Sequence, residues 1–292
     1  MEAELPPTIS KQLKLSLAQY RMWNTDTPVT KEPRVIKRLS GGHSNYSFLV
    51  EAEQKFVLRI DGIDTTALGL SRHSEWILLH RVAQAGLAPT PRYYNPDLKT
   101  LVVDYLVPEP NRDASSEEIA TFFKHLHSIP PIKFKLDLLQ RIRRYEHQLT
   151  RHFKEVRRIL KPHAKKLEKY LELINIDKTP VTLCHNDLNP SNRLFFKSSL
   201  WAIDWEYAAS GNPWFDIAAA FCSDELANET LKKEFLISYL EEENNFDESI
   251  GKIQLYSIVY TYLEILWNVV ALKRLPEDKD LTVLDMYLET GI

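Results

Sequence analysis

The chain has 292 residues, of which 44% are hydrophobic and 26% are charged, and its formal net charge is −3. These are ordinary values for a folded globular protein, so extensive disorder is excluded. The small negative charge argues against a general nucleic-acid binder. Only two cysteines occur, Cys184 and Cys222, and neither has a partner at metal-ligand spacing, so we expect neither a disulfide framework nor a zinc site.

Signals for export or membrane insertion are not evident in the sequence. The first residues, MEAELPPTISKQ, lack the basic and apolar regions of a signal peptide. The longest apolar run near the other end, LEILWNVVAL, is shorter than a bilayer span and contains Glu264. Together with the low cysteine count, this leads us to expect a cytoplasmic protein that does not insert into a membrane.

Residues from about Val35 to Asp104 have the pattern of strands around one helix. RVIKRLS predicts a first strand, and YSFLVEAEQKFVLRI predicts two more that are joined by a short polar turn. In LGLSRHSEWILLHRVAQAG the apolar residues recur at helical spacing, and Gly86 is well placed to end that helix. TLVVDYLV then predicts a buried strand. We therefore expect this part of the chain to form a small β-rich lobe.

Helical patterns dominate beyond Pro108. Ser115 and Glu118 have the spacing of a capping box ahead of IATFFKHLHSI. Residues 133–170 hold 13 Lys or Arg against four acidic residues, on a helical pattern interrupted at Pro162. A phosphate- or RNA-binding surface would explain this charge, but the recurring aliphatic residues favour the solvated face of a helical hairpin. NETLKKEFLISYLEEEN and IQLYSIVYTYLEILWNVVALK predict two further helices.

The stretch 183–216, LCHNDLNPSNRLFFKSSLWAIDWEYAASGNPWFD, is rich in Asp and Asn beside apolar, strand-like runs. TLCHNDL predicts a strand that runs into a loop, and NRLFF with LWAIDW predicts a short hairpin after it. Asp187 and Asn192 then lie on the loop, and Asp204 lies at the far end of the returning strand. Two carboxylates and an amide oxygen brought together in this way form a hard oxygen cluster that suits Mg²⁺.

These three residues can be given separate chemical roles. A carboxylate beside a substrate hydroxyl can accept its proton, which suits Asp187, while Asn192 and Asp204 can hold a metal ion against a triphosphate. The order of an Asp, four residues, an Asn, and a later Asp after an apolar strand is that of kinase catalytic and metal-binding loops. An Asx-rich turn would explain the asparagines but not Asp204 on an otherwise apolar strand, so we favour the catalytic interpretation.

The predicted small lobe contains groups that could bind a nucleotide. SGGHSN lies between two strands, where its glycines could let backbone amides approach phosphate oxygens, although a Gly-Gly turn is common in any hairpin. Arg59 lies among apolar residues of the next strand, so it either pairs with Glu75 on the following helix or faces water at a sheet edge. VVDYL would link the lobes, with backbone groups available to an adenine edge. The predicted nucleotide-binding residues are Ser40, Gly41, Gly42, Ser44, Asn45, Arg59, Glu75, Asp104 and Tyr105.

The motifs HNDLNPSN and AIDWEYAASGNPWFDIA closely resemble those of the aminoglycoside phosphotransferase and choline kinase superfamily, nearest to choline/ethanolamine kinases and bacterial thiamine kinases. SGGHSN resembles the choline-kinase phosphate loop, and the likeness extends from Val35 to the end of the chain. The resemblance implies an α+β, bilobal, protein-kinase-like fold, with a nucleotide-binding lobe over residues 1–107 and a catalytic and substrate-binding lobe over 108–292. It also implies ATP and Mg²⁺ as cofactors, with Arg59 and Glu75 as the nucleotide-side ion pair.

The same resemblance implies roles for individual residues in the stretch 183–216. It casts Asp187 as the catalytic base, with Asn192 and Asp204 as metal ligands. Glu206 would support the site, and Asp216 would hold the catalytic loop unless it only begins a helix. Asp-Trp-Glu replaces the Asp-Phe-Gly of protein kinases and no activation segment follows, so protein phosphorylation is disfavoured.

The acceptor side is expected to bind a cation. Choline kinases hold a quaternary ammonium in an aromatic cage; Trp267 falls where that family has a cage tryptophan, whereas Glu264 replaces a residue that is aromatic in the animal enzymes. One helical turn separates the two, so they should share a face, and a carboxylate could still bind an amine or thiazolium cation. Glu206 and Tyr207 complete the predicted substrate-binding set. For Tyr207 and for the further aromatic candidates Trp214, Tyr262 and Tyr287, core packing is the better explanation of any single ring.

These observations predict an ATP-dependent kinase for the hydroxyl of a choline- or ethanolamine-like amino alcohol or of thiamine, without a nucleic-acid partner. Aminoglycoside phosphorylation is an alternative, which would call for several carboxylates on the acceptor side. A nucleotide-binding pseudokinase is another, which the presence of Asp187, Asn192 and Asp204 disfavours.

Overall fold

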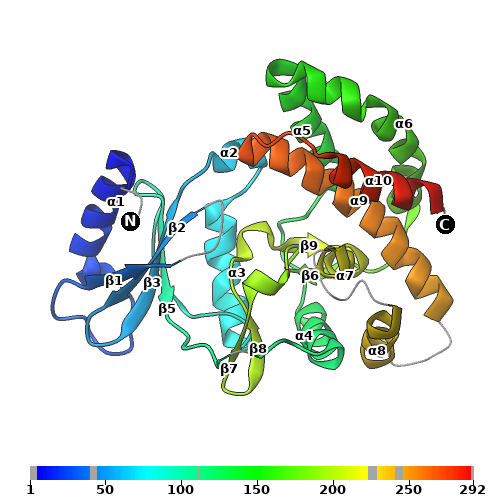
Figure 1. The fold of residues 1–292 in the computed structure, drawn as a ribbon. Helices are drawn as coiled ribbons and strands as arrows, with labels where there is room; N and C mark the ends of the chain where they lie inside the picture. Colours follow the sequence, from blue (N-terminus) through cyan, green and yellow to red (C-terminus); the bar gives the residue numbers. More distant parts are fainter. Residues whose placement is uncertain (1–4, 40–44, 111, 223–228, 241–245, 291–292) are drawn as a thin grey trace.

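The computed structural model describes residues 5–39, 45–110, 112–222, 229–240 and 246–290. Within these ranges the chain forms two lobes of different character (Figure 1). The N-terminal lobe is built on a five-stranded sheet, whereas helices and two small two-stranded sheets form the other lobe. The N-terminal elements are α1 (Pro7–Ala18), η1 (Tyr20–Met22), β1 (Arg34–Arg38), β2 (Asn45–Glu51), β3 (Lys55–Asp61), α2 (Thr65–Leu68), α3 (Arg72–Gln84), β4 (Pro91–Asn95) and β5 (Thr100–Asp104).

The N-terminal sheet is antiparallel, with strand order β1-β2-β3-β5-β4. β3 and β5 are central strands, so apolar side chains such as Leu58, Ile60 and Val102 are fully buried. Helix α1 lies against one face of the sheet, and α3 lies on the opposite side, toward the other lobe (Figure 1). The β-rich lobe expected from the sequence is therefore present, although α1 and β4 were not predicted.

Local signals define the ends of α3. The Ser71 hydroxyl accepts a hydrogen bond from the Ser74 N–H (3.2 Å) and caps the first turn. The helix ends at Gln84, and Gly86 follows with φ of +72°, a left-handed conformation that a glycine adopts without strain. The predicted helix stop at Gly86 is confirmed. At the other end the helix begins at Arg72, so Glu75 lies in its first turn.

Two clusters of buried apolar residues hold the molecule together. One joins α1 to the sheet through residues such as Leu13, Trp23 and Phe56. The other runs through the helical lobe and also takes in Leu68 of α2 and Leu78 of α3. The two helices between β3 and β4 therefore belong to the small lobe by sequence, but they pack with the core of the large one.

The helical lobe surrounds one long helix, α9 (Phe246–Leu272), which packs against α5, α6, α7 and α10. Its length and composition would suffice for a membrane span, but 67% of its most apolar window is buried inside the protein, as in a core helix. The run LEILWNVVAL thus belongs to a longer apolar helix than expected. The other elements are α4 (Ser116–Ser128), α5 (Leu138–His152), α6 (Lys154–Ile176), β6 (Thr182–Cys184), η2 (Pro190–Asn192), β7 (Arg193–Phe196), β8 (Ser199–Ala202), η3 (Trp205–Tyr207), β9 (Ala209–Gly211), α7 (Pro213–Cys222), α8 (Glu229–Tyr239) and α10 (Asp278–Thr290).

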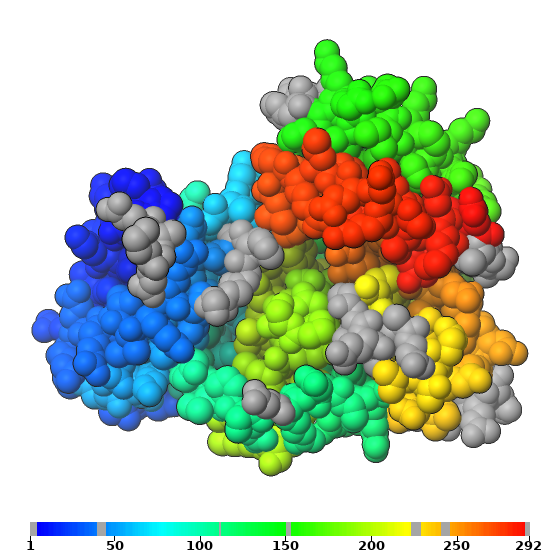
Figure 2. Space-filling model, viewed as in Figure 1, coloured from blue at the N-terminus to red at the C-terminus, as the bar shows by residue number. Residues whose placement is uncertain are grey.

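The basic segment forms the helical hairpin of α5 and α6, which projects from the molecule (green in Figure 2). Several of its aliphatic residues, such as Leu149 and Val156, are buried, and most of its charges are exposed. The predicted interruption at Pro162 is wrong, because α6 continues through that residue. Pro162 is exposed, so water can solvate the carbonyl that loses its helical hydrogen bond. The break between the two helices falls at Phe153 instead, whose φ and ψ are −136° and 59°.

The capping box predicted for α4 is present, with Ser115 and Glu118 each bonding the backbone N–H of the other. It starts a helix whose apolar face, including Leu126, is fully buried in the large core.

Replacing Leu126 by Ala should lower the free energy of unfolding by about 2–5 kcal/mol, because the substitution leaves a cavity in that core. Leu173→Ala on α6 is the matched control: this leucine is 43% exposed, so its loss should cost within about 0.5 kcal/mol. Urea denaturation measures both, and equal effects would contradict the packing described above.

Candidate active site

A buried carboxylate on α7 holds the backbone of the loop between β6 and β7. The N–H groups of His185 and Asn186 each donate to one oxygen of Asp216, at 2.7 and 2.6 Å. Asp216 is completely buried, and His127 of α4 also contacts it at 3.2 Å. These bonds match the holding role that the sequence suggested for Asp216. They also stabilise Asn186 in a left-handed conformation, with φ of +64°.

His185 joins this loop to the hairpin of β7 and β8. Its Nε2 lies 3.1 Å from the Ile203 carbonyl, and its Nδ1 lies 3.3 Å from the Asp187 N–H. Burial lowers the pKa of His185 to about 4, so the ring is neutral at pH 7. A neutral ring can donate from Nε2 and accept at Nδ1, which is the pattern that these two contacts require.

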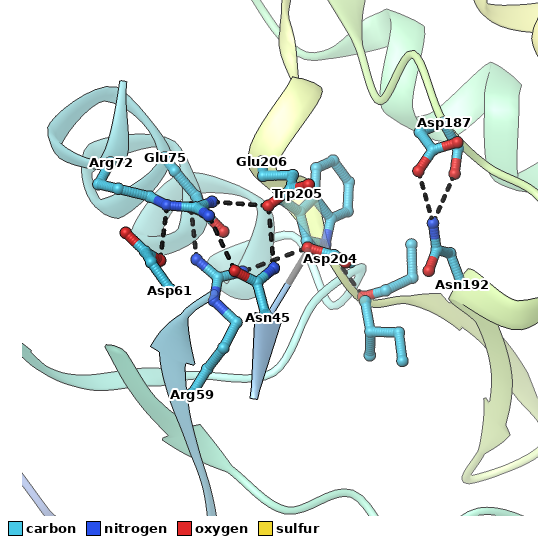
Figure 3. Close-up of polar contacts among 12 residues, drawn as sticks. Asn45, Arg59, Asp61, Arg72, Glu75, Asp187, Asn192, Asp204, Trp205 and Glu206 are labelled. Atoms are coloured by element: carbon cyan, nitrogen blue, oxygen red, sulfur yellow. Dashed lines mark hydrogen bonds and ion pairs between the residues drawn. The ribbon is translucent and has the colours of Figure 1, made fainter. Parts of the chain in front are cut away.

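Asp187 emerges from this support with both carboxylate oxygens held by amide groups. Asn189 Nδ2 donates to Oδ1 at 3.1 Å. Asn192 Nδ2 donates to Oδ2 at 2.9 Å (Figure 3). Burial raises the pKa of Asp187 to about 7, and the negative charges of Glu206 and Glu264 add to that effect. The carboxyl group is therefore oriented, and its pKa lies close to neutral pH.

Asp204 lies on the turn after β8, next to the Asp187 loop. The Ile203 N–H donates to the Asn192 carbonyl at 2.9 Å, which brings the two segments together. Burial raises the pKa of Asp204 well above its ordinary value, and Asp187 is among the charges that raise it further. Asp187, Asn192 and Asp204 thus converge from separate points of the chain, as the sequence predicted (Figure 3).

The donor atoms at this point fit a hard divalent cation. Asn192 uses Nδ2 to bond both the carbonyl and the carboxylate of Asp187, so its amide oxygen is the atom left for a ligand. The only described partner of the Asp204 carboxylate is Arg59, which donates to Oδ1 at 3.2 Å. Carboxylate and amide oxygens are ligands that Mg²⁺ accepts. The assignment of Asn192 and Asp204 as metal ligands stays a prediction.

The ion pair predicted for the nucleotide side is present. Arg59 on β3 contacts Glu75 on α3 at 2.6 Å, and both side chains are buried. Because Arg59 also contacts Asp204, it links the small lobe to the predicted metal-binding turn. Sequence alone left open whether Arg59 faced water, and the structure excludes that alternative.

A second arginine, Arg72, is nearly buried and was not among the predicted site residues. Its guanidinium contacts Asp61 at 2.9 Å, Glu75 at 2.9 Å and Glu206 at 2.8 Å. Asn45 completes the cluster, because it accepts from Arg72 at 2.9 Å and donates to Glu206 at 3.0 Å (Figure 3). A signal did exist in the sequence, since Arg72 precedes Glu75 by three residues in a predicted helix.

The predicted contacts of the lobe-linking segment need correction. The backbone N–H of Asp104 donates to Thr90 and that of Tyr105 donates to Lys55, so neither donor is free for an adenine edge. The Asp104 carboxylate binds Arg92 through two bonds of 2.7 Å. An adenine would have to use other backbone groups of this segment. Ser40, Gly41, Gly42 and Ser44 lie outside the part of the chain that the structure describes.

The residues predicted to bind the acceptor are aromatic and acidic. Trp267 Nε1 donates to the Tyr207 hydroxyl at 2.6 Å, so the two rings are fixed relative to each other. Glu264 lies one turn before Trp267 and is exposed, but surrounding protein limits its hydration and raises its pKa. Glu206, in contrast, is buried against Arg72 and Asn45, so the structure places it in the contact between the lobes.

The remaining aromatic candidates pack away from this group. Tyr262 is buried and donates to Glu146 at 2.7 Å. Trp214 packs against Tyr239 and lines a separate surface hollow together with Lys252. Core packing therefore explains both rings, as the sequence suggested.

Comparison with known proteins shows similar chains with related chemistry. The LicA homolog of Mycoplasma capricolum is 29% identical over 182 residues, which cover 61% of this chain and 70% of that protein. A thiamine kinase of Escherichia coli is 29% identical over 191 residues, 64% of this chain and 65% of that protein. The aligned region therefore spans slightly less than two thirds of the thiamine kinase.

Solved structures share the whole fold. The choline kinase LicA of Streptococcus pneumoniae superposes with a TM-score of 0.70 at 19% identity, covering 96% of this chain and 98% of that one. The ADP-bound aminoglycoside phosphotransferase APH(2'')-Ib gives 0.62 at 18% identity, covering 98% of each chain. The model of the phosphotransferase enzyme family matches residues 35–248, most of the chain. The protein therefore belongs to the phosphotransferase enzyme family, and it is a small-molecule phosphotransferase with a bilobal, protein-kinase-like fold.

Proposed function

We propose that the protein is an ATP- and Mg²⁺-dependent kinase that phosphorylates the hydroxyl group of a small cationic alcohol of the choline, ethanolamine or thiamine type. The observation that carries this proposal is the Asp187 carboxylate, which Asn192 holds beside Asp204 (Figure 3). Transfer of a phosphoryl group to an alcohol requires a base and two oxygen ligands for a metal ion close to one another. The LicA and thiamine kinase relatives support the acceptor class.

The residues of the catalytic loop divide the chemistry between them. As the acceptor oxygen forms its bond to the γ-phosphorus, its proton passes to a carboxylate oxygen of Asp187, and the bond between the γ-phosphorus and the bridging oxygen of ADP breaks. Asn189 and Asn192 orient that carboxylate. A pKa of about 7 suits a group that must accept a proton at neutral pH. Mg²⁺ held by Asn192 and Asp204 would neutralise charge on the phosphates.

Arg59 is placed to bind the phosphates from the small-lobe side. It already contacts Asp204, so a triphosphate that reaches the metal ligands would also meet this guanidinium. Glu75 holds the other arm of the guanidinium and limits its motion. The ADP bound to the structurally similar aminoglycoside phosphotransferase supports adenine nucleotide as the donor.

The acceptor side favours a compact cation. Glu264 is an exposed carboxylate, and its negative charge is among the causes that raise the pKa of Asp187, which supports Glu264 as the group that attracts the cation. Trp267 and Tyr207 present fixed aromatic rings next to it, to which a cation is attracted. This arrangement supports a cationic alcohol over a neutral one.

Aminoglycoside phosphorylation is the second candidate, because the aminoglycoside enzyme superposes over 98% of the chain. An ATP-consumption screen with choline, ethanolamine, thiamine and aminoglycosides distinguishes the two. We expect turnover with at least one of the first three compounds, whereas turnover with aminoglycosides alone would contradict the proposed acceptor class.

Replacing Asp187 by Asn should abolish turnover and stabilise the protein. Loss of a positioned base typically lowers kcat by about 10²–10⁴. Because the folded protein raises the pKa of Asp187 to about 7, ionisation of this group disfavours the folded state. That penalty is absent below the unfolded pKa of about 4 and complete above about pH 7. In EDTA at pH 8 the variant should therefore melt roughly 2–4 °C higher than the wild type, and the gain should shrink near pH 4.5.

Asp97→Asn is the matched control, because this aspartate is exposed on a turn of the small lobe. It should change neither turnover nor melting temperature. Turnover by D187N at the wild-type rate would remove Asp187 from the role of base.

Replacing Glu264 by Gln should weaken binding of the cationic acceptor. Loss of one charge-assisted contact should raise KM for that substrate roughly tenfold and leave KM for ATP nearly unchanged. Glu168→Gln, an exposed glutamate on α6, is the control. Steady-state kinetics with each substrate varied in turn makes the measurement, and equal KM values for the acceptor would show that Glu264 does not face it.

A further inference from the structure

We infer that Arg72 is a positioning residue for the nucleotide half of the site: by holding Asn45 and Glu206 together, it sets the start of β2 relative to the turn that carries Asp204. The contacts of Arg72 carry the geometric part of this inference. The expected effect on nucleotide binding rests on the proposed function. Arg72 lies in the first turn of α3, outside every motif that the sequence analysis assigned to the site.

The contacts of Arg72 span both lobes. Nη1 donates to Glu206 of the large lobe at 2.8 Å and to Glu75 of its own helix at 2.9 Å, while Nη2 donates to Asn45 at 2.9 Å. Asn45 bonds Glu206 directly at 3.0 Å, so the three side chains close a triangle between the lobes (Figure 3). All three are buried or nearly so. A triangle of direct bonds leaves little freedom for any one side to move alone.

Two corners of this triangle, Asn45 and Glu206, adjoin segments that the proposed reaction uses. Asn45 is the first residue of β2, directly after the segment SGGHS that was predicted to face the phosphates. Glu206 lies two residues after Asp204, on the short turn η3. Displacement of Glu206 would therefore displace Asp204 as well, because the two share one turn of backbone.

The chain before Arg72 is fastened to the large lobe. Three side chains of α5 donate to the carbonyl groups at the end of α2: Arg144 to Thr66 (3.2 Å), Gln148 to Ala67 (2.7 Å) and Tyr145 to Leu68 (3.3 Å). The Thr66 carbonyl also accepts from the Gly69 N–H at 3.1 Å, so α5 adds bonds to the carbonyl groups that end this helix. Leu68 is 1% exposed in the core of the large lobe. The backbone before Arg72 is thus fixed to the large lobe, so the hydrogen bonds of Arg72 can position Asn45 and Glu206.

The guanidinium is the side chain that suits this position. Its planar fork donates several bonds in fixed directions, whereas a lysine would offer one point charge in their place. Arg72 and Arg59 share one oxygen of Glu75, at 2.9 and 2.6 Å, so the two arginines form one continuous cluster. Arg59 reaches Asp204 and Arg72 reaches Glu206, so together they hold both carboxylates of the turn.

Arg72→Met tests the inference, with Arg72→Lys as a charge-retaining variant. Arg81→Gln is the control, because Arg81 lies on the same helix and also bonds the other lobe, at the Pro130 carbonyl (3.0 Å), but far from Asp204. We expect R72M and R72K both to raise KM for ATP and the Kd for Mg-ADP, measured by calorimetry, about tenfold or more. KM for the acceptor should change by less than about twofold, and R81Q should behave as wild type in every measurement.

A readout without nucleotide tests the geometry itself. Hydrogen–deuterium exchange should accelerate at residues 45–51 and 205–207 in R72M and not in R81Q. Asn45→Ala serves as a milder variant should R72M fail to fold, and it should accelerate exchange in the same two segments. Unchanged exchange in both segments, or wild-type affinity of R72M for Mg-ADP, overturns the inference. Failure of the wild type itself to bind Mg-ADP would overturn the proposed function, while the exchange result would still decide the role of Arg72.

Discussion

The site depends on the balance of charge between Arg59 and Arg72, which are buried or nearly so, and the carboxylates that surround them. Asp61, Glu75, Asp204 and Glu206 all lie within ion-pair distance of Arg59 or Arg72. A buried carboxylate without a partner is costly, so each acidic group needs its arginine in the folded state. Because the partners come from both lobes, the same ion pairs that form the site also fix the position of one lobe relative to the other.

The cluster carries more negative than positive charge, and that excess has a functional use. Two arginines oppose four carboxylates, and Asp187 and Glu264 add further negative charge nearby. Burial raises the pKa of Asp187 and Asp204, so the ionised forms of both groups are disfavoured in the folded protein. A divalent cation and a cationic acceptor would both relieve this excess. The negative charge of the cluster therefore favours the cationic ligands that we propose for the site.

Support for the catalytic loop comes from groups that take no part in the chemistry. Asp216 accepts two backbone N–H groups, and neutral His185 bonds the hairpin strand that precedes Asp204. Buried, fully bonded side chains of this kind hold the reacting groups with little motion. The large hydrophobic core, which reaches from α3 to α10, provides the rigid frame for these bonds.

Local signals in the sequence determined the parts of this protein that depend on near neighbours. The strand–loop–hairpin around Asp187, the capping box of α4 and the stop at Gly86 follow from turns, caps and periodicity within a few residues. The order of Asp187, Asn192 and Asp204 was enough to indicate their convergence, because one short hairpin connects them.

Tertiary structure alone decided the features that join distant segments. The bonds of Arg72 to Asn45 and Glu206 span up to 134 residues, and no local pattern specifies such pairs. The partners of the Asp104 and Tyr105 N–H groups depend on which segments lie next to β5. The continuation of α6 through Pro162 depends on the exposure of that residue to water. Sequence periodicity reports which residues are buried, but the partners of buried charges are set by how whole elements pack, and that packing is a property of the complete fold.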